Sequence, residues 1–156
     1  MKLITEELLD KVSEEAEASP RLRMNHNFHE SPQAPVQRML NALEPGTYLP
    51  PHRHKNPDRE EMYLVLRGKL ITFFFDDNGN ITERIELNPA GGKYGIEIPP
   101  GVWHSIVVLE KGTVIYEAKQ GPYIPLSKEN FAPWAPDVND VEAIKEYMKK
   151  LLKQQF

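Results

Sequence analysis

The sequence predicts a mainly β protein, namely an antiparallel double-sheet β-barrel of the jelly-roll type with a flanking helix at each end. Three observations support this fold class. Short runs rich in Val, Ile, Phe and Tyr fill the middle of the chain, and Pro or Gly clusters separate most of them. The 14 prolines, against 9 glycines, exclude long uninterrupted helices there. Residues 76–80 contain Asn-Gly, which favours a hairpin because both residues accept positive φ.

Two amphipathic helices are expected outside the barrel. The first covers residues 5–18, where Thr5 is a suitable N-cap and the apolar residues recur at helical spacing. The second covers residues 139–154, where Asn139 and Glu142 have the spacing of a capping box. The lysines of the second helix favour its C-terminal half, as the helix dipole prefers.

The segment between the helices divides into an arm, a barrel and a strap. The arm spans residues 19–35, the barrel 36–119 and the strap 120–136, all in one domain of residues 1–156. The strap is rich in proline and aromatic residues, which indicates an ordered segment packed across the barrel or a contact with a partner chain. The expected strands are residues 36–43, 62–67, 69–75, 81–87, 94–98, 104–109 and 113–119.

Composition excludes several classes of function. The chain of 156 residues has a formal net charge of −4, which argues against a binder of nucleic acid or of anionic membranes. It has no cysteine, so disulfides, Cys-ligated zinc and iron–sulfur clusters are excluded. No apolar run approaches the roughly 20 residues of a membrane span, and the first residues lack an apolar signal core. We therefore expect a cytoplasmic protein.

Three histidines and one acid suggest a metal site. His52 and His54 share a face if their segment is extended, so both can bind one ion. Glu61 opens the next strand run, with Glu60 as the competing carboxylate, and His104 follows a Pro-Pro-Gly turn. Three neutral imidazoles and a carboxylate suit a divalent Fe, Mn, Ni, Co or Zn ion. In an octahedral ion this set leaves about two positions open for water or substrate.

These residues resemble the two motifs of the cupin superfamily. The first motif corresponds to Gly46-x5-His52-x-His54-x6-Glu61-x6-Gly68, with a longer loop between His54 and Glu61. The core of the second corresponds to Pro99-x-Gly101-x2-His104, and Val108 stands where that motif usually has Asn. The resemblance implies a cupin barrel with a divalent metal ion bound by His52, His54, Glu61 and His104.

A narrower resemblance extends over roughly residues 5–136. Residues 19–29, 36–46, 121–123 and 131–136 are similar to the WbuC family of cupin-fold metalloproteins. Members of that family are associated with bacterial surface-polysaccharide clusters, which implies chemistry on sugars or nucleotide sugars. The resemblance does not specify the reaction.

Polar residues ahead of the barrel are candidates for substrate binding. Arg23, Asn25, Asn27 and His29 share one face if the segment is extended, and could hold a ligand rich in hydroxyl or carboxylate groups. Alternatively, the asparagines cap turns and His29 is an exposed loop residue.

Arg38, Tyr48 and Tyr63 are weaker candidates for the same role. Arg38 and Asn41 lie on opposite faces of one strand, so at most one of them faces the barrel interior. Tyr48 and Tyr63 could place a hydroxyl at the rim, although tyrosine in a β core more often packs with one hydrogen bond.

Two functions fit these observations. The first is a metal-dependent enzyme, of isomerase or oxygenase type, acting on a small sugar-like substrate. The second is a non-catalytic, metal-dependent module that binds a sugar or regulates a partner. A metal-free sugar epimerase on the same barrel is disfavoured, because it would not need the His-x-His pair with its acid. A homodimer is expected, because a partner chain often covers the exposed strand edges of small open barrels.

Overall fold

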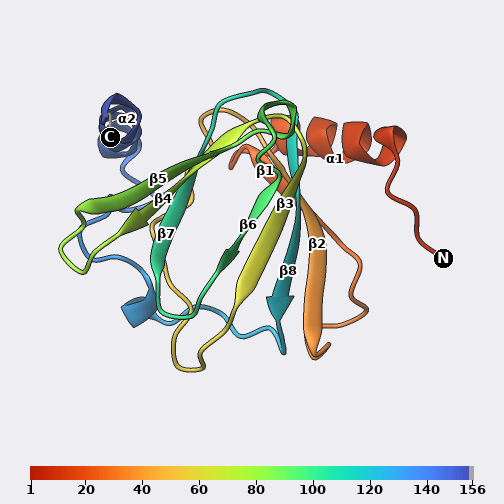
Figure 1. Ribbon diagram of the computed structural model, residues 1–156, viewed down its shortest axis with the longest axis horizontal. Helices are drawn as coiled ribbons and strands as arrows, with labels where there is room; N and C mark the ends of the chain where they lie inside the picture. The colour runs from red at the N-terminus through yellow and green to blue at the C-terminus, as the bar shows by residue number, and fades with distance from the viewer. Residues whose placement is uncertain (155–156) are drawn as a thin grey trace.

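The computed structural model, described here for residues 1–154, consists of two antiparallel sheets with a helix at each end (Figure 1). The five-stranded sheet has the order β1-β2-β8-β3-β6, and the three-stranded sheet has the order β5-β4-β7. This arrangement confirms the predicted jelly-roll barrel. The strands are β1 Arg23–Asn27, β2 Val36–Leu43, β3 Glu61–Arg67, β4 Leu70–Phe75, β5 Ile81–Leu87, β6 Gly95–Ile98, β7 Trp103–Val108 and β8 Thr113–Gln120.

The main core lies between the two sheets. Alternate residues of each strand point inward, so β3 contributes Tyr63 and Val65 while β7 contributes Ile106 and Val108. Strand β4 is buried on both faces, as its apolar sequence predicts. Phe74 packs in this main core, while Phe73 packs on the opposite face of the strand.

Helix α1, Glu6–Ala18, covers the outer face of the five-stranded sheet. The Thr5 hydroxyl accepts a hydrogen bond from the backbone N–H of Leu8, which confirms the predicted N-cap. Leu9, Val12 and Ala16 are buried against outward-facing residues of β2 and β8. Burial of this apolar stripe holds the helix on the sheet.

Helix α2, Val141–Lys153, packs outside the barrel, on the face that includes Phe73 of β4. The predicted capping box is wrong by one residue. Asp140 is the N-cap, and its carboxylate accepts from the N–H of Ala143. Asn139 instead contacts Asp137 through its backbone and side-chain amides, which commits its side chain to the preceding turn.

Two segments outside the predicted strands take part in the barrel. β1 lies within the arm and pairs with β2 from Arg23↔Leu43 to Asn27↔Met39. The strap includes a 3-10 turn, Lys128–Asn130. It runs beside the segment that contains His52 and His54, since the N–H of Ala132 donates to the carbonyl of Pro51. A second 3-10 turn, Pro89–Gly91, follows β5. Within the described residues, no helix is both long and apolar enough to cross a bilayer.

Candidate metal centre

Four side chains from three parts of the chain converge between the sheets. His52 and His54 lie on the segment before β3, Glu61 is the first residue of β3, and His104 is the second residue of β7. One nitrogen or oxygen atom from each lies within 4.8 Å of the corresponding atoms of the other three. These are the residues that the sequence proposed as metal ligands, so the fold places all four where one ion could contact them.

The backbone positions two of the imidazoles. The Nδ1 atom of His52 lies 3.0 Å from the carbonyl oxygen of Pro50, and that of His104 lies 2.9 Å from the carbonyl oxygen of Val102. A carbonyl oxygen only accepts, so each Nδ1 must carry the proton. The Nε2 atoms of both rings are therefore left with a free lone pair, the form that a metal ion requires.

The carboxylate of Glu61 lies close to two of these rings. Its Oε2 is 2.8 Å from Nε2 of His54, and its Oε1 is 3.4 Å from Nε2 of His104. Despite these distances, both Nε2 atoms are fully buried without a hydrogen bond of acceptable geometry. Buried polar atoms normally have a partner, and a cation placed between these nitrogens and the carboxylate would give both of them one. A metal ion supplies that cation, so the residues present fit a metal ion.

Electrostatics keep the donor atoms in the ligating form. Burial and the neighbouring His104 lower the pKa of His52 to about 3, so its ring is neutral at pH 7. Burial opposes ionisation of Glu61, but the neighbouring Lys119 ammonium favours the carboxylate, and the pKa of Glu61 lies well below its usual value. Neutral imidazoles and an ionised carboxylate are the states in which these groups bind a divalent ion.

A cavity of about 490 Å³ extends from the cluster towards β1. Arg23, Asn25, Asn27 and His29 line it together with His52 and Glu61. Arg23, Asn25 and Asn27 thus share one face, as an extended β1 requires, and His29, which lies beyond the end of β1, lines the same cavity. Their contact with a substrate stays a prediction.

The three weaker candidates lie elsewhere. Arg38 is exposed on the outward face of β2, and its backbone N–H and carbonyl both lie close to Nδ1 of His29. The Tyr48 hydroxyl donates to the carbonyl of Pro136 at 3.0 Å, away from the cavity. Tyr63 is buried below the cluster with its hydroxyl 2.6 Å from that of Thr72. None of the three lines the 490 Å³ cavity.

Sequence reasoning missed a polar pair beside the cluster. Glu117 and Lys119 lie on the inward face of β8, and the Lys119 ammonium lies 2.9 Å from Glu117 and 3.2 Å from Glu61. Asn41 donates a short hydrogen bond from its side-chain amide to Glu117. The sequence held one signal for this pair, because Glu-x-Lys on a strand places both charges on one face. The sequence alone does not tell whether that face points into the barrel or outward. In the structure Lys119 pairs with Glu61, so the face with Glu117 and Lys119 is the one that points into the barrel.

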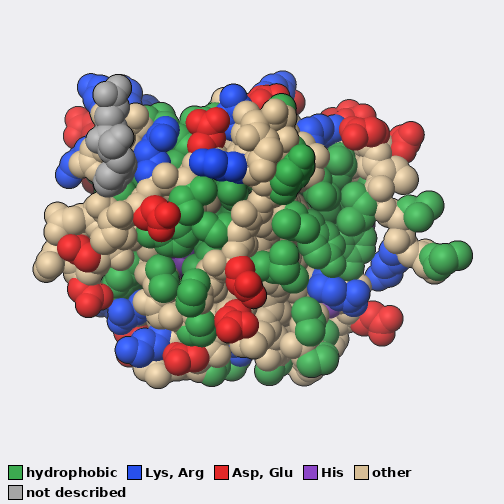
Figure 2. Space-filling view, viewed as in Figure 1, with side chains coloured by type: hydrophobic (Ala, Val, Ile, Leu, Met, Phe, Trp, Pro, Cys, Tyr) green, Lys and Arg blue, Asp and Glu red, His purple; other side chains and the backbone are tan. Residues whose placement is uncertain are grey.

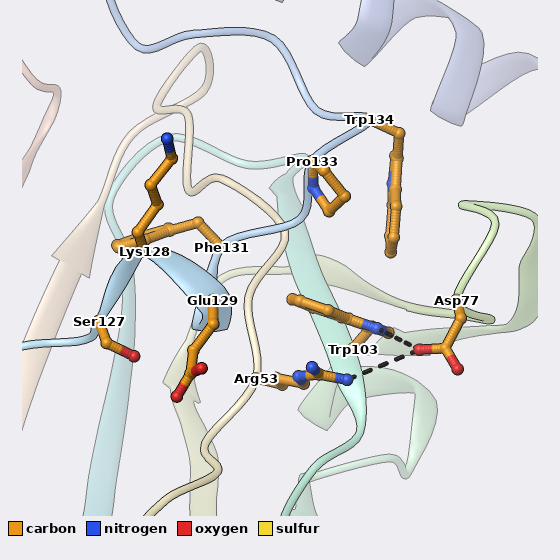
Figure 3. Close-up of a pocket in the computed structure, with 9 residues that line it drawn as sticks. All are labelled: Arg53, Asp77, Trp103, Ser127, Lys128, Glu129, Phe131, Pro133 and Trp134. Carbon is orange, nitrogen blue, oxygen red and sulfur yellow. Dashed lines mark hydrogen bonds and ion pairs between the residues drawn. The ribbon is translucent and has the colours of Figure 1, made fainter.

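A second hollow, of about 720 Å³, lies on the other side of the His52–His54 segment (Figure 3). Arg53 points there, opposite to its two neighbours, and its guanidinium lies 4.1 Å from the centre of the Trp103 ring. Asp77 receives a hydrogen bond from the Trp103 indole and an ion pair from Arg53. The hollow contains none of the four convergent donors, so it is separate from the candidate metal centre.

Comparison with solved structures shows which proteins share this fold. The chain resembles KdgF from Halomonas sp., with a TM-score of 0.52 and 16% identity over 69% of this chain and 85% of that one. It also resembles an oxalate oxidase in complex with glycolate, with a TM-score of 0.52 and 15% identity over 68% of this chain and 54% of that one. A protein of unknown function, SPY1581 from Streptococcus pyogenes, gives a TM-score of 0.50 and 13% identity over 68% of this chain and 80% of that one.

These likenesses show the fold, a jelly-roll barrel of two antiparallel sheets. The chain belongs to the family described as "Domain of unknown function (DUF6016)", whose model matches residues 4–87. That range includes His52, His54 and Glu61 but ends before His104. No protein of curated function matches the sequence.

Proposed function

We propose that this protein is a metal-dependent enzyme that acts on a small, polar, sugar-like substrate. The observation that carries the proposal is the four-residue cluster, two of whose members, His52 and Glu61, line a 490 Å³ cavity together with amides and charged groups. His52, His54, Glu61 and His104 would hold the ion, which is a divalent Fe, Mn, Ni, Co or Zn ion. When bound, such an ion supplies Lewis acidity and orients substrate oxygens.

The polar pair on β8 provides the group that proton transfer needs. Glu117 is nearly buried and is held by Asn41 and Lys119, so its carboxylate has a fixed position beside the cluster. A carboxylate so placed can take a proton from one substrate carbon and return it to the neighbouring carbon. Together with movement of the C2 hydroxyl proton to the carbonyl oxygen, this transfer converts an aldose into a ketose without any external oxidant, so isomerisation is the reaction that these residues support best.

Lys119 has a different role from Glu117. Burial lowers the pKa of its ammonium, but Glu117 and Glu61 outweigh that effect and raise the pKa above its usual value. Lys119 is therefore protonated at neutral pH and cannot act as a base. It donates to both carboxylates, and we propose that it keeps Glu117 oriented while Glu61 serves as a ligand.

The biological setting proposed here rests on resemblance. Similarity to the WbuC family supports a sugar or sugar-derived substrate of surface-polysaccharide metabolism in the cytoplasm. One structural neighbour, an oxalate oxidase, forms a complex with glycolate, which is also a small oxygen-rich molecule. Neither likeness names the substrate of this protein.

Elemental analysis of protein purified without chelator is the first test of this proposal. We expect about one transition-metal ion per chain. The metal-loaded protein is then incubated with a panel of aldoses and ketoses, and product is followed by NMR in D₂O. Isomerisation with deuterium uptake at the carbon next to the carbonyl, abolished by chelation, would support the enzyme. Metal-dependent ligand binding without turnover would instead assign a non-catalytic sugar-binding or regulatory module.

We also propose a homodimer. Leu64 and Leu66 on β3 and Tyr94 beside β6 are large apolar residues that are 39%, 38% and 61% exposed. Figure 2 shows apolar side chains gathered beside α1 on the face of the molecule that it draws. Light scattering after size exclusion tests the assembly, and a monomer that persists at high micromolar concentration would contradict it.

A further inference from the structure

Arg23 is a half-buried cation with no acidic partner. It lies at the start of β1 and lines the cavity that leads to the candidate metal centre. Among residues 1–154, no carboxylate lies within ion-pair distance of its guanidinium. A charge that is partly removed from water without a counter-charge loses solvation that something else must replace.

Only part of the guanidinium is used by the protein. Its NH1 nitrogen donates to the hydroxyl of Thr47 at 3.2 Å and to the carbonyl of Tyr48 at 2.9 Å. These two bonds tie the side chain to the loop after β2 and fix its direction. A guanidinium has five N–H groups, so three remain free for another acceptor. A positioned fork of free N–H groups suits a planar or tetrahedral oxyanion.

The net charge of the cavity lining also favours an anionic ligand. The two cations Arg23 and Lys119 balance the two carboxylates Glu61 and Glu117 among the lining side chains. Lys119 is already committed to both carboxylates, so Arg23 carries the charge that is not neutralised locally. A divalent ion at the cluster would add two positive charges with no further carboxylate to offset them. The loaded cavity would then favour an anion.

Besides Arg23, the arm gives the cavity wall neutral hydrogen-bonding groups. Asn25 and Asn27 follow Arg23 on the same face of β1, and His29 comes next. The Asn25 amide has only the sulfur of Met39 as a partner, at 3.5 Å, so its polar atoms are almost free. Amides both donate and accept, which matches a row of hydroxyl groups.

We propose that the ligand of this cavity is an anionic sugar derivative, which places its oxyanion on Arg23, its hydroxyls along Asn25 and Asn27, and its other end at the cluster. The inference rests on the proposed function for the identity of the site, and it adds the charge of the substrate and the residue that selects it. The oxyanion is a carboxylate or a phosphate, since Arg23 binds either.

Binding calorimetry on the metal-loaded protein tests the inference with three probes of similar size. The probes are gluconate, glucose 6-phosphate and the uncharged polyol sorbitol. We expect at least one of the two anions to bind about tenfold more tightly than sorbitol. Arg23→Gln should remove that preference, while Arg23→Lys should keep part of it. Arg38→Gln is the matched control, because Arg38 is an exposed arginine of the adjacent strand that does not line the cavity.

The outcomes separate this inference from the proposed function. Metal content and thermal unfolding are measured on every variant, so a loss of preference counts only in a folded, loaded protein. Equal affinity for all three probes, or an anion preference that survives Arg23→Gln, would overturn the inference while leaving the metal-dependent enzyme standing. A protein that binds no metal, yet still prefers an anion through Arg23, would overturn the proposed function and not the inference.

Discussion

His52, which lies outside the named strands, pairs through its backbone with His104 of β7. The N–H of His52 donates to the carbonyl of His104 at 3.0 Å, and the N–H of His104 donates to the carbonyl of His52 at 2.9 Å. Their ring centres lie 4.4 Å apart as a result. Two of the candidate ligands are therefore brought together by main-chain hydrogen bonds and not by an ion.

We expect removal of the metal to leave the fold intact. Because the backbone places His52 and His104, chelation should keep the β-sheet circular dichroism signal and lower only the thermal midpoint. An ion that binds the folded state alone stabilises it by about 4 kcal/mol at a thousand times its dissociation constant. Re-addition of the metal should restore the midpoint. Loss of the sheet signal on chelation would show that the ion, and not the backbone, organises the cluster.

Replacing His52 and His54 together with Ala should abolish stoichiometric metal. Two of four donors are lost, and the remaining two cannot hold a divalent ion against competing water. Inductively coupled plasma mass spectrometry measures the metal per chain. The matched control is His26→Ala with His29→Ala, which removes two histidines outside the cluster. The ligand assignment fails if the cluster variant keeps full occupancy.

Glu117→Gln should reduce turnover by about a hundredfold or more, the usual contribution of a general base. The amide cannot accept a proton from carbon, yet it is nearly isosteric and leaves the four candidate ligands unchanged. Metal content should therefore stay at the wild-type value. Glu60→Gln, an exposed neighbour of Glu61, is the control. Wild-type turnover in the Glu117 variant would exclude the residue as the base.

The stability of the metal-free protein should rise with pH through the range in which an ordinary histidine titrates. The folded protein holds the pKa of His52 at about 3, against about 6.5 for the unfolded chain. Between these values the unfolded state binds the extra proton, so His52 destabilises the fold as the pH falls below 6.5. Its slope is at most about 1.4 kcal/mol per pH unit.

Urea denaturation of chelated wild type and His52→Gln at pH 5.0 to 6.5 measures that slope. The stability of the wild type relative to the variant should increase over this interval and level off above it. Parallel curves for the two proteins would show that His52 has the same pKa in the folded and the unfolded state.

Gly68→Ala should destabilise the fold more than Gly92→Ala. Both glycines have positive φ, +83° and +78°, which costs about 1–2 kcal/mol in a residue with a side chain. A Cβ on Gly68 would also lie 2.7 Å from the backbone Cα of Thr113, whereas one on Gly92 meets nothing within 4 Å. Thermal unfolding measures the midpoints of the two variants. Equal midpoints would show that β8 shifts at little cost to accommodate the added methyl group.

Local sequence determined much of this protein. Period-2 runs predicted the barrel strands to within about one residue, and Thr5 predicted the start of α1, because both signals act between near neighbours in the chain. The order His-x-His, Glu and His after a Pro-Pro-Gly turn also indicated the candidate ligands. Capping was less certain where Asn139 and Asp140 compete, since either side chain can accept from the first helical turn.

Only the tertiary structure decided what surrounds the cluster. Arg-Met-Asn-His-Asn has little intrinsic preference for strand, and β1 forms because β2 offers it an open edge. Glu117 and Lys119 are ordinary charged residues in the sequence, and Asn41 is an ordinary amide. The β3–β8 register brings Lys119 opposite Glu61, and the β2–β8 register brings β2 alongside Glu117. Such long-range pairing depends on burial across sheets, which no short window of the chain contains.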